Sequence, residues 1–141
     1  MNDLRYEVLY LMGFVEAIDL YLTEFQEKNK ISCNFENTIS KLDMDEKKAT
    51  SLFRIFQNAM SNVAQHAKAT EVKINLYQTG EKLVLEITDN GIGFDPEKLS
   101  NEASNRFIYM KERAILLGGE VKVTSSLNKG TTVQIEIPYS N

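Results

Sequence analysis

The chain has 141 residues, of which 43% are hydrophobic and 26% charged, so it can bury one core of ordinary size. Its net charge of −4 and pI of about 5.1 argue against a broad basic surface for nucleic acid. A single cysteine, Cys33, excludes an internal disulfide and is interpreted as a small core residue. The longest apolar run, residues 8–18, is short and contains Glu16, so neither a membrane span nor a signal peptide is expected. The expected location is the cytoplasm, whether the domain stands alone or is part of a larger protein.

Hydrophobic spacing predicts three helices and five strands. Two pairs of strands are interpreted as hairpins, and hairpin-joined strands with helices on one face predict an α+β sandwich. The elements expected in chain order are a helix over 14–28, a strand over 31–35, a helix over 43–67, strands over 71–78 and 82–89, a helix over 106–117, and strands over 119–126 and 130–138.

Local signals predict where these elements begin and end. Asp43 is expected to start the second helix, with Glu46 three residues later completing a capping box. Thr79-Gly80 is interpreted as a hairpin turn, residues 90–105 as a polar loop, and Gly118-Gly119 as the end of the third helix.

The second helix carries an unusual polar face. At about 100° per residue, Arg54, Asn58, Asn62 and Gln65 share one narrow stripe, with His66 at its edge. Asparagine costs about 0.7 kcal/mol relative to alanine in a helix. The two amides therefore indicate a ligand, although a solvated polar stripe remains the alternative.

Two further segments are rich in glycine. TDNGIGFDP, residues 88–96, directly follows a strand, and Gly91 and Gly93 would let the backbone approach a ligand while Asp89 accepts a hydrogen bond. In NKGTTVQIEIP, residues 128–138, a glycine precedes Thr131, whose hydroxyl could point inward. Each segment alone is also compatible with an ordinary turn.

Together, in this order, the three segments resemble the nucleotide-binding boxes of the GHKL ATPase superfamily, with its Bergerat fold. RIFQNAMSNVAQHAKA resembles the N-box, DNGIGF the G1 box, and MKERAILLGGEVKVTSSLNKGTTVQIEIP the final helix and hairpin. The likeness is strongest to the catalytic domain of sensor histidine kinases of the nitrate-sensor type. It implies a two-layer α/β sandwich with a mostly antiparallel mixed sheet of about five strands, covered on one face by three helices. It also implies a connector from missing dimerisation helices over 1–12 and a catalytic domain over 13–141.

The resemblance also implies roles for individual residues. Asn62 corresponds to the Mg²⁺ ligand that bridges the ATP phosphates, and Asn58 to the catalytic position facing the γ-phosphate. Asp89, Gly91, Gly93 and Thr131 correspond to the adenine pocket. His66 would lie near the nucleotide or structure the helix end, and would not be the phosphorylated histidine.

The chain departs from the family pattern at several positions. Asn58 stands where many relatives have glutamate, and Gln65 where they have lysine or arginine. Ser104, Arg106 and Tyr109 replace glycines of the lid that closes over the phosphates. We therefore expect the third helix to start early, with Ser104 or Asn105 as its N-cap and its N-terminus directed at the phosphates. Arg106 would then contact the phosphates through its side chain, unless it is simply solvated.

The implied function is the ATP·Mg²⁺-binding catalytic domain of a histidine kinase, which transfers the γ-phosphoryl group to a histidine outside this chain. The implied partners are the phosphoacceptor dimerisation domain of the same kinase and a response regulator. The fragment is expected to be a monomer and the full-length protein a homodimer, and the domain would lie in the cytoplasm, either alone or as the cytoplasmic part of a membrane-bound sensor. One alternative is a degenerate nucleotide-binding module that regulates a partner by docking. Another is a serine kinase of the anti-sigma type.

Overall fold

The computed structural model describes residues 8–10, 12–39 and 41–140. The expected connector over residues 1–12 lies mostly outside the described residues, and its boundary with the catalytic domain stays a prediction. Leu9, which belongs to this segment, is buried in the hydrophobic core.

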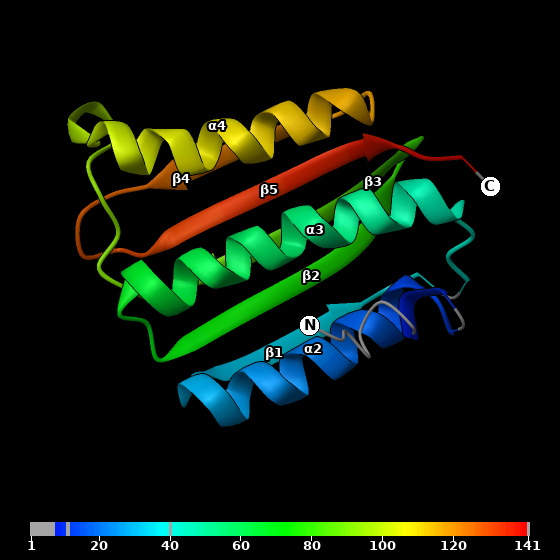
Figure 1. Ribbon diagram of the computed structural model, residues 1–141, viewed down its shortest axis with the longest axis horizontal. Helices are drawn as coiled ribbons and strands as arrows, with labels where there is room; N and C mark the ends of the chain where they lie inside the picture. The colour runs from blue at the N-terminus through cyan, green and yellow to red at the C-terminus, as the bar shows by residue number, and fades with distance from the viewer. Residues whose placement is uncertain (1–7, 11, 40, 141) are drawn as a thin grey trace.

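The described residues form a five-stranded sheet with three long helices on one of its faces (Figure 1). The strand order is β1-β2-β3-β5-β4; β1 pairs with β2 in parallel, and the other neighbours pair antiparallel. This confirms the predicted two-layer α+β fold with a mixed, mostly antiparallel sheet. The elements are α2 (Phe14–Asn29), β1 (Ser32–Asn37), α3 (Glu46–Asn62), the π-helical turn η1 (Val63–Ala67), β2 (Glu71–Thr79), β3 (Lys82–Asp89), the 3₁₀ turn η2 (Pro96–Lys98), α4 (Asn101–Leu116), β4 (Glu120–Ser125) and β5 (Thr131–Pro138).

The start of α3 differs from the prediction. Asp45 is the N-cap, because its side chain accepts a 2.9 Å hydrogen bond from the Lys48 backbone N–H. The prediction that Asp43 and Glu46 form a capping box at the start of this helix is therefore wrong. The backbone N–H of Asp43 donates instead to the hydroxyl of Tyr139, which ties the start of this segment to the C-terminal end of the sheet.

The start of α4 differs more. The helix begins at Asn101, so both the start at residue 106 and an N-cap at Ser104 or Asn105 are wrong. Ser100 is the cap, since its hydroxyl accepts from the Ala103 N–H at 3.1 Å. The segment 101–105 contains neither glycine nor proline, so nothing in it stops the helix from extending towards Ser100.

Strand alternation separates the two faces of the sheet. Inward-facing residues such as Ile74, Leu85 and Ile135 are fully buried beneath the helices. Between α2 and α3, the Tyr21 ring packs edge-on against Phe53 and Phe56. This apolar layer fixes α3 against the sheet and thereby sets the position of its polar stripe.

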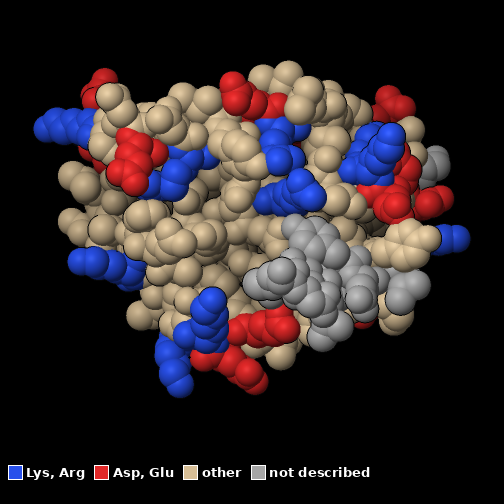
Figure 2. Space-filling view, in the orientation of Figure 1, with Lys and Arg blue, Asp and Glu red and all other residues tan. Residues whose placement is uncertain are grey.

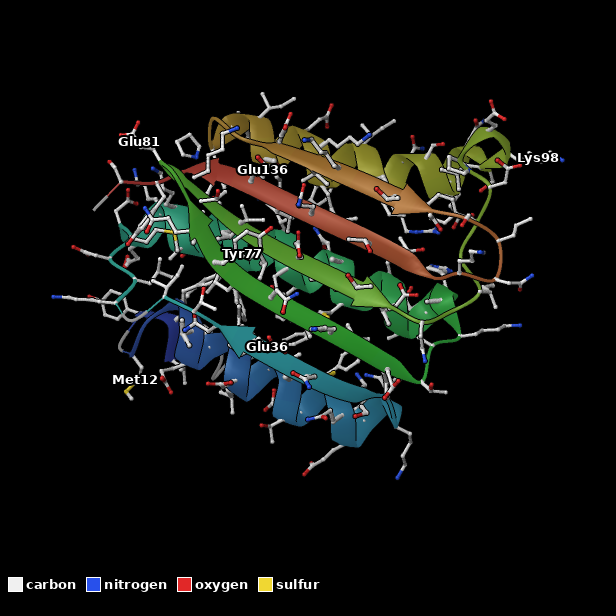
Figure 3. All side chains as sticks on the ribbon, turned by 180° about the vertical axis from the view of Figure 1, so that it is seen from behind. Met12, Glu36, Tyr77, Glu81, Lys98 and Glu136 are labelled. Atoms are coloured by element: carbon white, nitrogen blue, oxygen red, sulfur yellow. The ribbon has the colours of Figure 1, made fainter. Side chains whose placement is uncertain are left out.

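The other face of the sheet is not covered by a helix (Figure 3). Its side chains are polar and interlocked: Glu86 accepts hydrogen bonds from the Tyr77 hydroxyl at 2.8 Å and from Gln134 at 2.7 Å. The bond to Glu86 is the main reason why the pKa of Tyr77 is raised, since it stabilises the protonated phenol. Glu136 similarly lies within 3.6 Å of Lys82 and Lys122.

Candidate functional site

A cavity of about 240 Å³ opens between the C-terminal end of α3, the inner face of the sheet and the first turns of α4. Residues from all three predicted boxes line it, although they are up to about 70 positions apart in the chain. Its lining consists of Ala59, Asn62, Val63, His66, Ala67, Ile87, Asp89, Ile92, Gly93, Phe94, Leu99, Ala103, Arg106, Phe107, Thr131 and Val133. Apolar walls with a few polar groups are the usual form of a site for a flat organic ligand.

Asp89 is the one buried residue with a charged side chain among the described residues. One of its oxygens, Oδ1, accepts a 2.8 Å hydrogen bond from the Gly91 backbone N–H. Burial raises the pKa of this carboxyl, and the backbone hydrogen bonds from Gly91 and Thr131 partly oppose that effect. A carboxylate offers about four lone-pair positions, so it can still accept from a donor group of a ligand.

The two glycines of the 88–96 segment have different tasks. Gly93 lines the cavity and has a φ of +62°, which glycine adopts without strain. Gly91 does not line the cavity. A Cβ on Gly91 would collide with the backbone oxygen of Ala67, and the next residue, Ile92, donates its N–H to that oxygen at 2.8 Å. Gly91 therefore lets the loop pack closely against the end of the α3 segment, and affects the cavity only indirectly.

Ser125, at the end of β4, is a site residue that the sequence interpretation missed. Its Oγ accepts a hydrogen bond from the Phe94 N–H at 2.9 Å, donates to the Gly130 carbonyl at 2.9 Å and lies 2.9 Å from the Thr131 hydroxyl. It thus joins the 88–96 loop to the hairpin that carries Thr131. The only signal in the sequence was a serine on the inward-facing side of a strand, where a hydrophobic residue would be expected.

The α3 segment ends in a π-helical turn, Val63–Ala67, where a regular helix was predicted. Such turns widen the helix by one residue and are frequent at functional sites. Asn62 precedes the turn and His66 lies within it, and both line the cavity. His66 is exposed and reaches the cavity from the rim.

A second cavity, of about 420 Å³, lies along the same groove between α3 and α4. It shares Asn62 and Arg106 with the first, so the two cavities join at this pair of residues. The residues that line it all carry polar groups: Asn58, Ser61, Asn62, Gln65, Glu102, Asn105, Arg106 and Tyr109. Arg54, which the helical wheel placed on the same stripe, does not contribute to the lining.

Several polar atoms at this junction are buried without a partner. The Nδ2 atoms of Asn58 and Asn62 and the Nε atom of Arg106 have no hydrogen-bond partner among the described residues. Buried donors of this kind normally bind an acceptor. The oxygens of a phosphate chain are such acceptors. Arg106 is half-buried and lines both cavities, and its contact with phosphate stays a prediction.

The groove has a direction, because α3 and α4 lie side by side and run antiparallel (Figure 1). Moving away from Asp89, α3 presents His66, then Asn62, then Asn58. The cavity along this path borders the flank of α4, through residues 102, 105, 106 and 109. Ser100 caps α4, because its side chain accepts from the Ala103 N–H and its carbonyl accepts from the Ser104 N–H. A phosphate contact with the N-terminus of α4 stays a prediction.

An elongated ligand with a flat apolar end and an acceptor-rich tail fits this groove. Residues 47–141 match the family described as histidine kinase-, DNA gyrase B- and HSP90-like ATPases. The chain belongs to this family. The predicted superfamily is thus confirmed, and the chain is an ATPase domain of this family.

Two curated relatives align with nearly the whole chain. The signal transduction histidine-protein kinase/phosphatase DegS of Brevibacillus brevis is 33% identical over 98% of this chain. The sensor histidine kinase ComP of Bacillus subtilis (strain 168) is 34% identical over 96%. The aligned region spans 36% of DegS and 18% of ComP, so the chain covers only a minor part of either protein. The nitrate-sensor subtype stays a prediction.

Solved structures confirm the fold. The Erythrobacter litoralis EL346 blue-light activated histidine kinase superposes with a TM-score of 0.75 at 22% identity, covering 96% of this chain and 48% of that one. The Acinetobacter baumannii histidine kinase AdeS superposes with a TM-score of 0.71 at 13% identity, covering 97% and 75%. None of the helices in the described residues has the length and apolar character needed to cross a membrane.

Proposed function

We propose that this domain binds ATP·Mg²⁺ and transfers the γ-phosphoryl group to a histidine outside the chain, as the catalytic domain of a sensor histidine kinase. The observation that carries the proposal is the joined groove, which runs from buried Asp89 through Asn62 and Arg106 to Asn58. The family match and the names of the two relatives support it.

The adenine would lie in the first cavity. The carboxylate of Asp89 would accept a hydrogen bond from the adenine amino group. Thr131 lies beside Asp89, because the two residues pair across β3 and β5. Gly93 allows the loop backbone to approach the base. His66 borders the same cavity from its rim and lies between the base and the phosphates.

The phosphates would lie in the second cavity. Arg106 and the amides of Asn58 and Asn62 donate to phosphate oxygens, which satisfies their buried polar atoms. The amide oxygen of Asn62 suits Mg²⁺, an ion that keeps several waters and takes phosphate oxygens as its other ligands. Among the described residues no group of three or more His, Cys, Asp or Glu gathers, so the donors fit a metal that arrives with its nucleotide. When bound, Mg²⁺ supplies charge neutralisation on the phosphates.

In the transfer, the bond from the γ-phosphorus to the bridging oxygen breaks and a bond to an imidazole nitrogen of the acceptor forms, with ADP leaving. This chain contributes binding and alignment of the γ-phosphoryl group. Asn58 has no basic group and acts as a hydrogen-bond donor. His66, the only histidine in the chain, lies on the wall of the nucleotide site itself, so it is not the acceptor.

The proposed partners follow from this reaction. A phosphoacceptor dimerisation domain supplies the histidine, within a homodimeric full-length kinase of which this domain is a monomeric part. A response regulator receives the phosphoryl group, and nucleic acid is not a partner. We propose a cytoplasmic location, where ATP and Mg²⁺ are available and where the unpaired Cys33 stays reduced.

Two measurements test the proposal. Calorimetry should show binding of ATP and ADP in the presence of Mg²⁺, with GTP at least tenfold weaker. Incubation with γ-labelled ATP and a phosphoacceptor domain supplied in trans should then place label on the acceptor histidine, while mass spectrometry finds His66 unmodified. Tight nucleotide binding without any transfer would favour the degenerate regulatory module, whereas labelling of His66 or absence of nucleotide binding would overturn the proposal.

A further inference from the structure

Tyr109 and Arg113 lie one helical turn apart on α4 and contact each other. The Cζ atom of the Arg113 guanidinium lies 4.7 Å from the centroid of the Tyr109 ring, within the range of a cation–π interaction. The Nε atom of Arg113 is buried and has no hydrogen-bond partner among the described residues. None of the ion pairs between described residues includes Arg113. This guanidinium is therefore held against an aromatic ring rather than against a carboxylate.

Tyr109 forms the far wall of the second cavity. It lines that cavity together with Asn58, while neither residue lines the cavity that contains Asp89. Because α3 and α4 run antiparallel, the steps from Asn62 to Asn58 and from Arg106 to Tyr109 both lead away from the adenine end (Figure 1). A nucleotide that enters at Asp89 would reach Asn58 and Tyr109 with its last phosphate.

The second cavity has almost no net charge of its own. Apart from amides, hydroxyl groups and the Tyr109 ring, its lining contains one cation, Arg106, and one carboxylate, Glu102. A nucleoside triphosphate brings about four negative charges, so a further cation near its end would be strongly favourable. Basic side chains lie along α4 and its boundary with α3 (Figure 2), and on α4 Arg113 comes one turn after Tyr109. Arg113 lines neither cavity, so its charge would act on the groove through the Tyr109 ring.

We propose that the Tyr109–Arg113 pair selects nucleoside triphosphates over diphosphates by holding a positive charge at the γ-phosphate end of the groove. Tyr109 contacts the end of the nucleotide, and Arg113 is a positioning residue that acts through the ring. The proposal rests on the proposed ATP site and concerns only its last phosphate. It assigns a function to a tyrosine that stands where relatives have a lid glycine, and to an arginine with no other polar partner for its Nε.

The test compares a non-hydrolysable ATP analogue with ADP, both with Mg²⁺, by calorimetry on the wild type and five variants. Arg113→Gln and Tyr109→Ala should each weaken the triphosphate about fivefold and leave ADP within twofold. The double variant should be no weaker than either single one, because the two residues act as one unit. Tyr109→Phe keeps the ring and should keep the preference for the triphosphate over ADP. Lys111→Gln, which removes a charge from an exposed neighbour on the same helix, should also leave both affinities unchanged.

The outcomes separate the possibilities. A structural role alone would lower the thermal midpoint and weaken both nucleotides equally, which would overturn the proposal. Additive losses in the double variant, or an equal effect of Lys111→Gln, would also overturn it. If the wild type bound neither nucleotide, the proposed function itself would fail; if it bound both and the variants kept the triphosphate preference, only the pair's role would fail.

Discussion

Asp89 and Thr131 occupy directly paired positions on the antiparallel strands β3 and β5, where both line the apolar cavity. The pair brings together a carboxylate and a hydroxyl that are 42 positions apart in the sequence. One carboxylate oxygen is already held by the Gly91 N–H. The orientation of the remaining acceptor is therefore set by the backbone, and this makes the chemistry of base recognition predictable.

Asp89→Asn should change which base the domain prefers. The Gly91 N–H requires an acceptor, so the asparagine would place Oδ1 towards Gly91 and its NH₂ group towards the cavity. A donor there opposes the adenine amino group and suits a carbonyl. We expect ADP affinity to fall at least tenfold, since a charge-assisted hydrogen bond contributes about 1.5–3 kcal/mol. The affinity for inosine diphosphate should fall much less, because its base carries a carbonyl in place of the amino group. Calorimetry with both nucleotides checks this, and equal losses would contradict it.

The same substitution should stabilise the free domain. Burial raises the folded-state pKa of Asp89, so ionisation of this carboxyl costs folding free energy. Its contribution is fully present below the unfolded-state pKa and is lost as pH rises through the raised folded-state pKa. Asp89→Asn should therefore raise the thermal midpoint at pH 7, and by less at pH 5. Thermal unfolding at both pH values tests this, and a lower midpoint at pH 7 would show that the carboxylate has a stabilising partner in the fold.

The sequence pattern predicted the fold and the polar residues that the fold brings to the cavity, for physical reasons that differ between segments. Alternation is regular in β2 and is interrupted in β3 only by Val84, because one face of the sheet is buried, so the strands could be recognised locally. Asn62 was chosen because asparagine is costly in a helix, and Asp89 because it leaves a strand just before two glycines. The role of Ser125 could not be found this way, since it depends on contacts with Phe94 and Thr131 that only the folded chain brings together.

The errors lie at helix ends. Both Asp43 and Asp45 can cap a helix, and the hydrogen bond from the Asp43 N–H to Tyr139 decides between them. The π-helical turn at the end of α3 was not recognised in the sequence; it ends at Ala67, whose carbonyl accepts from the Ile92 N–H of the Gly91 loop. The early start of α4 was predicted in direction from the missing lid glycines, but Ser100 was not considered as the cap.

Ser125→Ala should lower both the stability of the domain and its nucleotide affinity, although Ser125 does not line the cavity. Its Oγ accepts from the Phe94 N–H and donates to the Gly130 carbonyl, and both groups would lose a partner. We expect a loss of about 1–3 kcal/mol in the free energy of unfolding, together with weaker nucleotide binding. Urea unfolding measures the first and calorimetry the second. Ser126→Ala, at the exposed neighbouring position, is the matched control and should change neither.

Asn62→Ala should remove the magnesium dependence of ATP binding. If the amide oxygen of Asn62 ligates the ion, the affinity gained on adding Mg²⁺ should largely disappear, while binding of ADP without metal should lose no more than one hydrogen bond, about 0.5–1.5 kcal/mol. Titrations with and without Mg²⁺ measure this gain. Asn34→Ala removes an exposed amide from β1, whose alternation puts it on the helix-free face of the sheet, and should leave the gain unchanged. A full magnesium gain in the Asn62 variant would show that the polar stripe of α3 does not bind the ion.

Glu102→Gln should strengthen the binding of ATP in the absence of Mg²⁺. Glu102 is the one carboxylate in the lining of the second cavity, on the first turn of α4, and its charge would repel phosphates there when no ion is present. Without Mg²⁺, the variant should bind ATP several-fold more tightly than the wild type, and the difference should shrink at high salt because the residue is exposed. AMP, which would not extend into that cavity, should bind both proteins equally.

Glu112→Gln, ten positions later on the same helix and outside the cavity, controls for net charge. Equal tightening by Glu112→Gln would show that only the overall charge matters. An unchanged affinity in Glu102→Gln would show that the phosphates do not reach this part of the groove.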